Sequence, residues 1–251
     1  MKVKTMVMLF IIFAFHPVYG QTVFIFNPEA KAGDLKKVKT AIKSYLASQG
    51  VKSDIYFFAN PVDFEDSVPR LKPACAIVAS YYFTLMKDKF HWQSALSGHY
   101  KGKKEFSKVL VTLKSITDVT QLKNKSLAAV SLGASSLPYI DSQLPKGLTT
   151  KSLRVVSVSK DIDAIMALGF EQVQAAIVTE ASFKKLESIN PEASKNLHLI
   201  QKLSSIQYPK LAVFPKIQGS NKLKAAFKNI PYKGSARKIL RFFSITGFVE
   251  E

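Results

Sequence analysis

The chain has 251 residues, with 36 lysines and arginines against 18 aspartates and glutamates, which gives a formal net charge of +18. A single cysteine, Cys75, excludes a small secreted domain that depends on disulfides, so the protein needs an ordinary hydrophobic core. Because Cys75 lies in an apolar run, we interpret it as a buried small side chain rather than a reactive thiol.

Residues 1–20 have the pattern of a secretory signal peptide. Two lysines precede an apolar core, 6–15, which is shorter than the roughly 20 residues that a helix needs to span a bilayer. An uncleaved membrane anchor is the alternative, but we favour cleavage before Gln21. The sequence therefore predicts a soluble exported protein, most simply a periplasmic one.

The lysines cluster at 31–52, 101–125 and 216–241. Nucleic-acid binding is not favoured, since the chain has an export signal and lacks zinc-finger, helix-turn-helix and RNP-type motifs. In the first cluster, lysines alternate with apolar residues at helical spacing, which is typical of a solvated helix face. The high net positive charge would attract an anionic ligand, an acidic partner or a membrane surface.

Beyond the signal, short apolar runs alternate with longer amphipathic segments. The apolar runs predict strands at 21–27, 53–58, 74–79, 106–113, 126–130, 153–157, 175–178, 197–203 and 211–214. The amphipathic segments predict helices at 33–49, 61–71, from 81, from 135, 161–168, 179–188, 219–229 and 234–244. We interpret the polar segment 87–104 as a loop with a short helix. This alternation predicts an α/β fold with mainly parallel sheets covered by helices on both faces.

Polar side chains follow several of the predicted strands, at the edge where open α/β sheets bind ligands. This edge of the predicted sheets carries hydroxyl groups, an amide, aromatic rings and one carboxylate, as expected for a binding cleft. The candidate ligand contacts are Asn27, Ser80, Tyr81, Tyr82, Ser131, Ser135, Ser136, Thr179 and Glu180.

The stretch 131–136, SLGASS, is the most informative of these segments. It follows a predicted strand and opens a predicted helix, where backbone N–H groups have no partner within the helix. Unpaired N–H groups beside serine hydroxyls favour an anion. The sequence therefore predicts an anion site here without naming the anion.

Each candidate also has a purely structural explanation. Ser80 and Ser135 are residue types that cap helices, whether or not they contact a ligand. Tyr81 and Tyr82 are equally compatible with packing, and Glu180 with a favourable charge at a helix N-terminus. These alternatives stay open at the level of the sequence.

Metal and catalytic sites are not predicted. His91 and His99 are separated by eight positions, with no nearby acidic partner except Asp88, and stacking of Trp92 on a ligand is the weaker interpretation of that residue. No serine–histidine–aspartate order, nucleophile elbow or paired-carboxylate motif is present. We expect a binding protein without a cofactor rather than an enzyme.

The order of elements resembles that of type 2 periplasmic solute-binding proteins, and the phosphate- and phosphonate-binding (PhnD-like) branch is the most similar. Residues 101–119 resemble its crossing strand, and 197–215 its return strand. LKNKSLA, at 122–128, resembles the "L-K-G-K-x-V-A" entry to the second lobe. EQVQAA, at 171–176, stands in the place of a "G-x-V-D-A-A" strand.

The chain departs from the pattern of that branch at three places. The turn SLGASS replaces an "S-T-S-G" turn and keeps serines at 135 and 136. Gln174 stands where an aspartate is usual, and Asn124 where a glycine is usual. The departures affect the expected ligand more than the expected fold.

The resemblance implies two α/β lobes joined by two crossing strands that act as a hinge. Lobe 1 would comprise 21–113 plus 204–251, and lobe 2 would comprise 114–203. A ligand would lie between the lobes, and a hinge motion would close them around it.

The leading functional hypothesis is a monomeric periplasmic solute-binding protein for an ABC-type permease. It would capture a small anionic or zwitterionic ligand, such as a phosphate, a phosphonate or an organic acid. One alternative is an exported module of the same fold that acts as a sensory or protein-interaction partner. Another is a basic protein that binds acidic surfaces.

Overall fold

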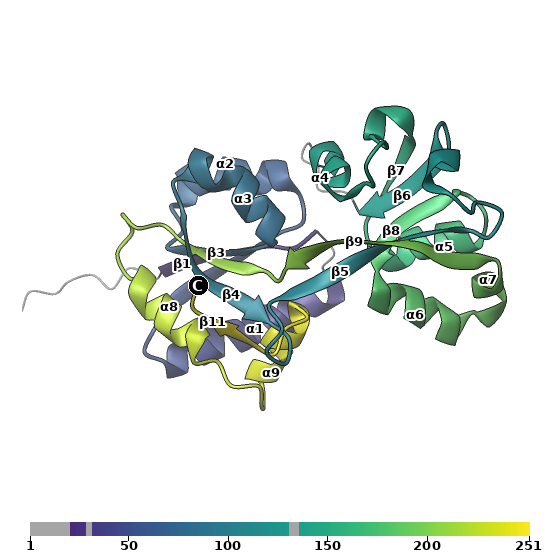
Figure 1. Cartoon of the computed structure of the whole chain (residues 1–251). Helices are drawn as coiled ribbons and strands as arrows, with labels where there is room; N and C mark the ends of the chain where they lie inside the picture. Colours follow the sequence, from purple (N-terminus) through teal and green to yellow (C-terminus); the bar gives the residue numbers. More distant parts are fainter. Residues whose placement is uncertain (1–20, 29–31, 131–135) are drawn as a thin grey trace, which may run out of the picture.

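The computed structural model describes residues 21–28, 32–130 and 136–251. The proposed signal segment and two of the candidate residues, Ser131 and Ser135, lie outside these ranges. Within them the chain forms two α/β lobes side by side, each built on its own sheet (Figure 1). The expected two-lobed α/β class is therefore confirmed.

The sheet of the first lobe has the strand order β11-β4-β10-β3-β1-β2. Parallel ladders join β1 to β2 and β3, whereas β10 and β11 pair antiparallel, so the sheet is mixed rather than mainly parallel. The strands are β1 (Gln21–Phe26), β2 (Ser53–Phe58), β3 (Cys75–Val78), β4 (Gln93–His99), β10 (Lys210–Val213) and β11 (Gly247–Val249).

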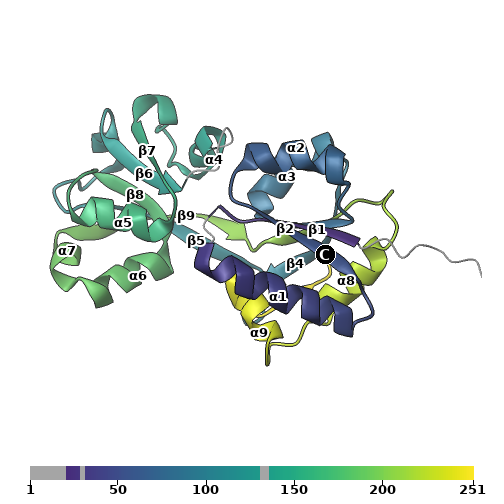
Figure 2. The ribbon, with the colours of Figure 1, turned by 180° about the vertical axis from the view of Figure 1, so that it is seen from behind.

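Two helical layers cover this first sheet, one on each face, as the front and back views show (Figures 1 and 2). One layer consists of α1 (Ala32–Ser48), α8 (Ser220–Lys228) and α9 (Ala236–Phe242), and its apolar side chains pack in one core cluster. The other consists of α2 (Pro61–Leu71) and α3 (Ser80–Phe90), which enclose an aromatic cluster around Phe64. Cys75 is fully buried, as expected, and burial raises the pKa of its thiol.

The second lobe has the strand order β7-β6-β8-β5-β9, with parallel ladders from β6 to β7 and β8 and antiparallel ladders from β5 to β8 and β9. Its strands are β5 (Glu105–Leu113), β6 (Ser126–Val130), β7 (Arg154–Val158), β8 (Ala175–Thr179) and β9 (Leu197–Gln207). Its helices are α4 (Ser136–Gln143), α5 (Asp161–Gly169), α6 (Glu180–Ile189) and α7 (Pro191–Lys195), with 3-10 turns at Val119–Leu122 and Thr150–Ser152.

The chain crosses between the lobes twice, after β4 and after β9. Both long strands, β5 and β9, pair over their whole length within the second sheet. By sheet membership, residues 105–113 and 204–207, which the sequence-based division placed in the first lobe, belong to the second.

The predicted elements were wrong at 87–104, which contains strand β4 instead of a loop with a short helix, and α7 and β11 were not predicted. The sequence of β4, QSALSGH, is rich in small and polar residues although it pairs with β10 on one side and β11 on the other. A Cβ on Gly98 would lie 3.0 Å from the Ile245 side chain and 3.1 Å from the Pro209 carbonyl oxygen. Trp92, just before this strand, is buried and donates its indole N–H to the Phe83 carbonyl, so it is a core residue.

No helix in the described part of the chain is both long enough and apolar enough to cross a bilayer.

Candidate functional site

A cleft of about 900 Å³ lies between the two lobes and is lined by residues of both. The first lobe contributes the ends of β1 and β3, the start of α3 and the end of α9. The second contributes β5, the start of α5, the β8–α6 junction and the end of β9. The polar and aromatic lining residues include Asn27, Ser80, Tyr81, Tyr100, Lys108, Tyr139, Asp161, Thr179, Glu180, Ser182, Gln207, Tyr208 and Arg241.

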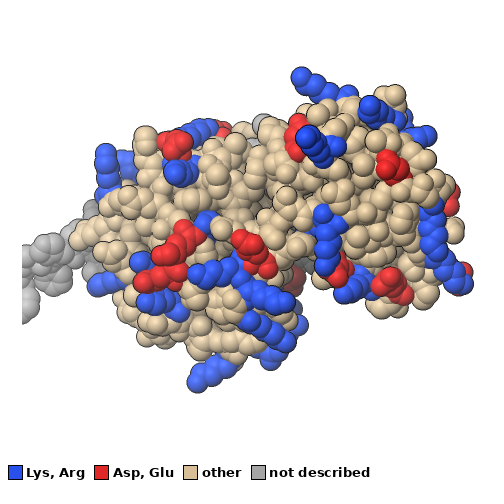
Figure 3. All heavy atoms as spheres, in the orientation of Figure 1, with Lys and Arg blue, Asp and Glu red and all other residues tan. Residues whose placement is uncertain are grey.

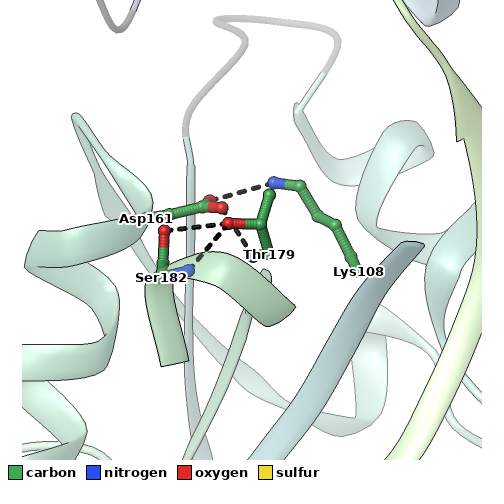
Figure 4. A network of polar contacts seen from close by, with 4 residues as sticks. All are labelled: Lys108, Asp161, Thr179 and Ser182. Carbon is green, nitrogen blue, oxygen red and sulfur yellow. Dashed lines mark hydrogen bonds and ion pairs between the residues drawn. The ribbon is translucent and has the colours of Figure 1, made fainter. Parts of the chain in front are cut away.

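A buried polar network forms the second-lobe wall of the cleft (Figure 4). The Lys108 ammonium donates to Asp161 Oδ1 at 3.0 Å, and both side chains are more than nine-tenths buried. The other carboxylate oxygen, Oδ2, accepts the backbone N–H of Thr179 at 2.6 Å. Because an isolated charge is costly to bury, the opposite charge of each side chain offsets the cost of burying the other in the wall.

Thr179 extends this network into the start of α6. Its hydroxyl accepts the backbone N–H of Ser182 at 3.2 Å and lies 2.8 Å from the Ser182 hydroxyl, which makes Thr179 the N-cap of the helix. The network therefore ties β5, α5 and α6 together at one point and fixes the direction in which α6 meets the cleft.

Glu180, the first residue of α6, lines the cleft and also faces two lysines. Its carboxylate lies 2.9 Å from the Lys184 ammonium and 3.6 Å from that of Lys202. The hydrogen bond from Lys184, with the charges of both lysines, holds the pKa of this carboxyl below its usual range. Glu180 therefore stays ionised and presents a negative charge at the cleft.

The start of α3 forms the opposing wall. The Ser80 hydroxyl donates across the lobes to the Gln207 carbonyl on β9 at 2.7 Å, so it does not cap its own helix. The N-cap residue is Ala79, which makes no side-chain capping bond, and it lines the cleft with Ser80. The first N–H groups of α3 thus lack a capping side chain and, with the helix dipole, favour an anion at this end.

Tyr81 and Tyr82, adjacent in the sequence, have different positions. Tyr81 lines the cleft, and its ring centroid is 4.7 Å from that of Tyr139 on α4, so the pair spans the lobes. Burial, followed by the charge of Asp141, raises the pKa of Tyr81. Tyr82 is fully buried beneath the first sheet, with its hydroxyl donating to Glu65 at 3.0 Å, so the candidate role of Tyr82 in ligand contact is corrected to a core role.

The structure brings five of the candidate residues to one cleft: Asn27, Ser80, Tyr81, Thr179 and Glu180. Ser136, the first residue of α4, is buried and is not among the residues that line this cleft. Ser131 and Ser135 lie outside the described residues, so the anion turn predicted from SLGASS stays a prediction.

The sequence reasoning missed Lys108, Asp161, Tyr139 and Arg241, all of which line the cleft. The sequence did contain an indication for Lys108, because it is the one lysine of β5 and stands directly before the buried run VLVT. Asp161 was interpreted only as the start of a helix. Among the described residues, no three His, Cys, Asp or Glu side chains converge as a metal site.

A protein-family model described as "ABC transporter, phosphonate, periplasmic substrate-binding protein" matches residues 24–251. Comparison with curated protein sequences gave no match.

Several solved structures share the fold at low sequence identity. A binding-protein component of an ABC phosphonate transporter from Pseudomonas aeruginosa has 16% identity and a TM-score of 0.70, over 93% of this chain and 82% of its own. PhnD1 from Prochlorococcus marinus, in complex with methylphosphonate, has 14% identity and a TM-score of 0.71, over 93% of each chain. A Xanthomonas citri protein bound to ATP has 12% identity and a TM-score of 0.70, over 92% of this chain and 90% of its own.

Proposed function

Because the chain belongs to the family of periplasmic substrate-binding proteins of phosphonate ABC transporters, we propose that its interlobe cleft captures a small anionic or zwitterionic solute for delivery to a membrane permease. The family is one of binding proteins rather than enzymes, and the resemblance noted in the sequence is confirmed. We further propose that residues 1–20 are removed on export and that the mature protein acts as a monomer in the periplasm.

The single observation that carries this proposal is a cleft of about 900 Å³ with an uncapped helix start on one wall and the carboxylate of Glu180 on the other. The N–H groups at the start of α3 would receive the anionic end of the solute. Glu180 would accept a donor from the solute's other end, which favours a zwitterion such as an aminophosphonate over a bare dianion.

The expected affinity follows from a few strong contacts. Each charge-assisted hydrogen bond contributes roughly 1.5–3 kcal/mol to binding. Three or four of them, less the cost of ordering the ligand and closing the lobes, are consistent with a micromolar dissociation constant, which corresponds to about −8 kcal/mol.

A thermal-shift and calorimetry screen tests the proposal with methylphosphonate, 2-aminoethylphosphonate, phosphate, sulfate and small organic acids. A ligand at 100 times its dissociation constant stabilises the folded protein by about 2.7 kcal/mol. In a chain of this size we expect the unfolding temperature to rise by roughly 5–10 °C. A screen in which no solute shifts the transition would overturn the proposal and favour an exported module of the same fold without a ligand.

Two variants on α6 test the role of Glu180. Glu180→Gln removes the charge at the cleft, whereas Glu187→Gln removes an exposed charge on the same helix outside the cleft. We expect Glu180→Gln to weaken 2-aminoethylphosphonate roughly tenfold and to leave methylphosphonate unchanged or tighter. Equal effects of the two substitutions would exclude a direct contact between Glu180 and the solute.

A further inference from the structure

The two faces of the first sheet differ sharply in charge. The layer formed by α2 and α3 is nearly neutral, with the acids Asp63, Glu65, Asp66 and Asp88 against the bases Arg70, Lys87 and Lys89. The layer formed by α1, α8 and α9 contains only one acid, Asp34, in these helices. Its bases are Lys36, Lys37, Lys39, Lys43, Lys222, Lys224, Lys228, Arg237, Lys238 and Arg241.

This asymmetry is also present in the sequence, where no aspartate or glutamate occurs between Glu192 and Glu250. Figure 3 shows lysine and arginine side chains gathered over the lower part of the first lobe, where α8 and α9 lie. In that view the surface between the lobes is almost free of charged side chains. The excess positive charge is therefore concentrated on the layer of α1, α8 and α9, although basic side chains also occur elsewhere on the surface.

Some of the basic side chains of this layer form ion pairs with acidic side chains of the protein, and others do not. Lys224 and Lys228 face Glu250 at 3.4 and 3.1 Å, and Lys43 pairs with Asp54. Among the described residues, no acid lies within ion-pair distance of the exposed bases Lys36, Lys37, Lys39, Lys222, Lys233, Arg237, Lys238 and Arg241. We call these eight residues the basic face.

Exposed aromatic rings lie beside the basic face, and one of them, Tyr56, has its ring centroid 5.9 Å from the Lys39 ammonium. Tyr232, in the loop between α8 and α9, is 41% exposed, and the Arg237 guanidinium lies 5.1 Å from its ring centroid. Figure 1 shows this loop projecting from the lower end of the first lobe. Tyrosine beside basic residues is typical of segments that rest in the headgroup region of a bilayer.

We propose that the basic face binds the surface of a bilayer rich in anionic phospholipids, with the α8–α9 loop and α9 nearest the headgroups. Exposed bases of a single sign on convex helices match a diffuse layer of phosphates, which requires no fixed geometry of partners. A specific acidic protein would instead need carboxylates placed to match the individual bases of α1 and α9. Because the end of α9 also lines the interlobe cleft, such binding would hold the cleft close to the membrane.

The expected strength follows from the number of bases. A lysine or arginine next to an anionic bilayer changes the partition coefficient about fivefold at moderate ionic strength. Reversing the charge of three residues on the basic face should therefore weaken binding by at least the order of 100-fold. Salt should release the protein, because the Debye length falls from about 10 Å at 0.1 M to about 3 Å at 1 M.

The test is cosedimentation of the purified protein with vesicles of phosphatidylcholine alone or mixed in equal parts with phosphatidylglycerol. The variant Lys233→Glu/Arg237→Glu/Lys238→Glu alters the basic face. The matched control, Lys123→Glu/Lys146→Glu/Lys151→Glu, makes the same change of net charge on exposed lysines of the second lobe. The corresponding triple glutamine variants repeat the comparison with a smaller perturbation of folding.

We expect the wild type to bind only the phosphatidylglycerol vesicles and to be released at high salt. The basic-face variant should lose this binding, and the control should retain most of it. Equal losses in the two variants would overturn the proposal, since binding would then depend on net charge alone. A wild type that does not bind the anionic vesicles at about 0.1 M salt would also overturn it and leave an acidic protein as the occupant.

Discussion

Lys108 on β5 and Asp161 at the start of α5 form an ion pair with 3.0 Å between Nζ and Oδ1, and neither side chain is more than 7% exposed. Buried pairs of this kind contribute little net stability relative to an apolar pair, but the loss of one partner leaves an uncompensated charge. Because the pair lies in the wall of the cleft, its role is to fix the geometry of β5, α5 and α6 there.

The first prediction concerns this pair. Asp161→Ala leaves the Lys108 ammonium without its carboxylate and the Thr179 N–H without its acceptor, so we expect a loss of about 3–5 kcal/mol in the free energy of unfolding. Urea denaturation monitored by circular dichroism measures it. The double variant Lys108→Met/Asp161→Leu should be more stable than Asp161→Ala alone. A single variant as stable as the wild type would show that the pair has no such role.

The second prediction contrasts two adjacent tyrosines. Tyr82→Ala empties a fully buried position beside Phe26 and Phe64, and we expect it to cost about 3–5 kcal/mol of stability. Tyr81→Ala loses chiefly the ring contact with Tyr139, which is worth about 0.5–1.5 kcal/mol. Denaturation compares the stabilities of the two variants, and the ligand-induced shift of the unfolding temperature compares their binding. Tyr81→Ala should reduce the shift, and a reversed order of the two stabilities would contradict the assignment.

Much of the fold follows from local patterns in the sequence. Strands β2 and β6 and helix α2 have the limits that their apolar runs predict, because each is a buried run or amphipathic segment bounded by turn residues. The departures from the family pattern also have local reasons. Asn124 adopts a left-handed φ of 62°, which asparagine tolerates where glycine is usual. The amide of Gln174 accepts both the N–H and the hydroxyl of Ser126.

The site was less predictable, because it depends on contacts between distant segments. Strand β4 has a polar sequence whose burial comes from β10 and β11, more than a hundred residues away. The pairing of Lys108 with Asp161 joins positions 53 residues apart, and no local pattern indicates it. Tyr81 and Tyr82 are chemically identical, so only the direction of α3 relative to the core decides which one meets the cleft.

The third prediction concerns two glycines with the same backbone conformation. Gly219 and Gly147 both have φ of +94°, where an L side chain is strained. A Cβ on Gly219 would also overlap the Gln21 side-chain amide, whereas Gly147 faces open space. We expect Gly147→Ala to cost about 1 kcal/mol and Gly219→Ala to cost more, since Gln21 must also move. Equal losses on thermal denaturation would show that Gln21 moves aside without a penalty.

The last prediction is a pH dependence that comes from Glu251. Its carboxylate accepts hydrogen bonds from the Lys210 ammonium and the Ser97 hydroxyl, both on buried parts of the first sheet. Burial by itself would raise the pKa of Glu251, but the hydrogen bonds from Lys210 and Ser97 outweigh it and hold the pKa at about 2. Because the folded pKa lies below the ordinary value of 4.5, the stabilisation is complete above about pH 4.5 and is lost as the pH falls towards 2.

Glu251→Gln tests this dependence, because glutamine keeps the shape and removes the charge. The lowered pKa of Glu251 alone would correspond to about 3 kcal/mol in the free energy of unfolding. Because the side chain is 35% exposed, solvent screens its charge, and we expect a contribution of about 1–2 kcal/mol. The free energy of unfolding from urea titrations should therefore differ between the variant and the wild type at pH 7 and converge between pH 4.5 and 2. Glu250→Gln, which removes an exposed partner of Lys224 and Lys228, is the control. A difference for Glu251→Gln that stays constant down to pH 2 would mean that the contact does not depend on the charge of the carboxylate.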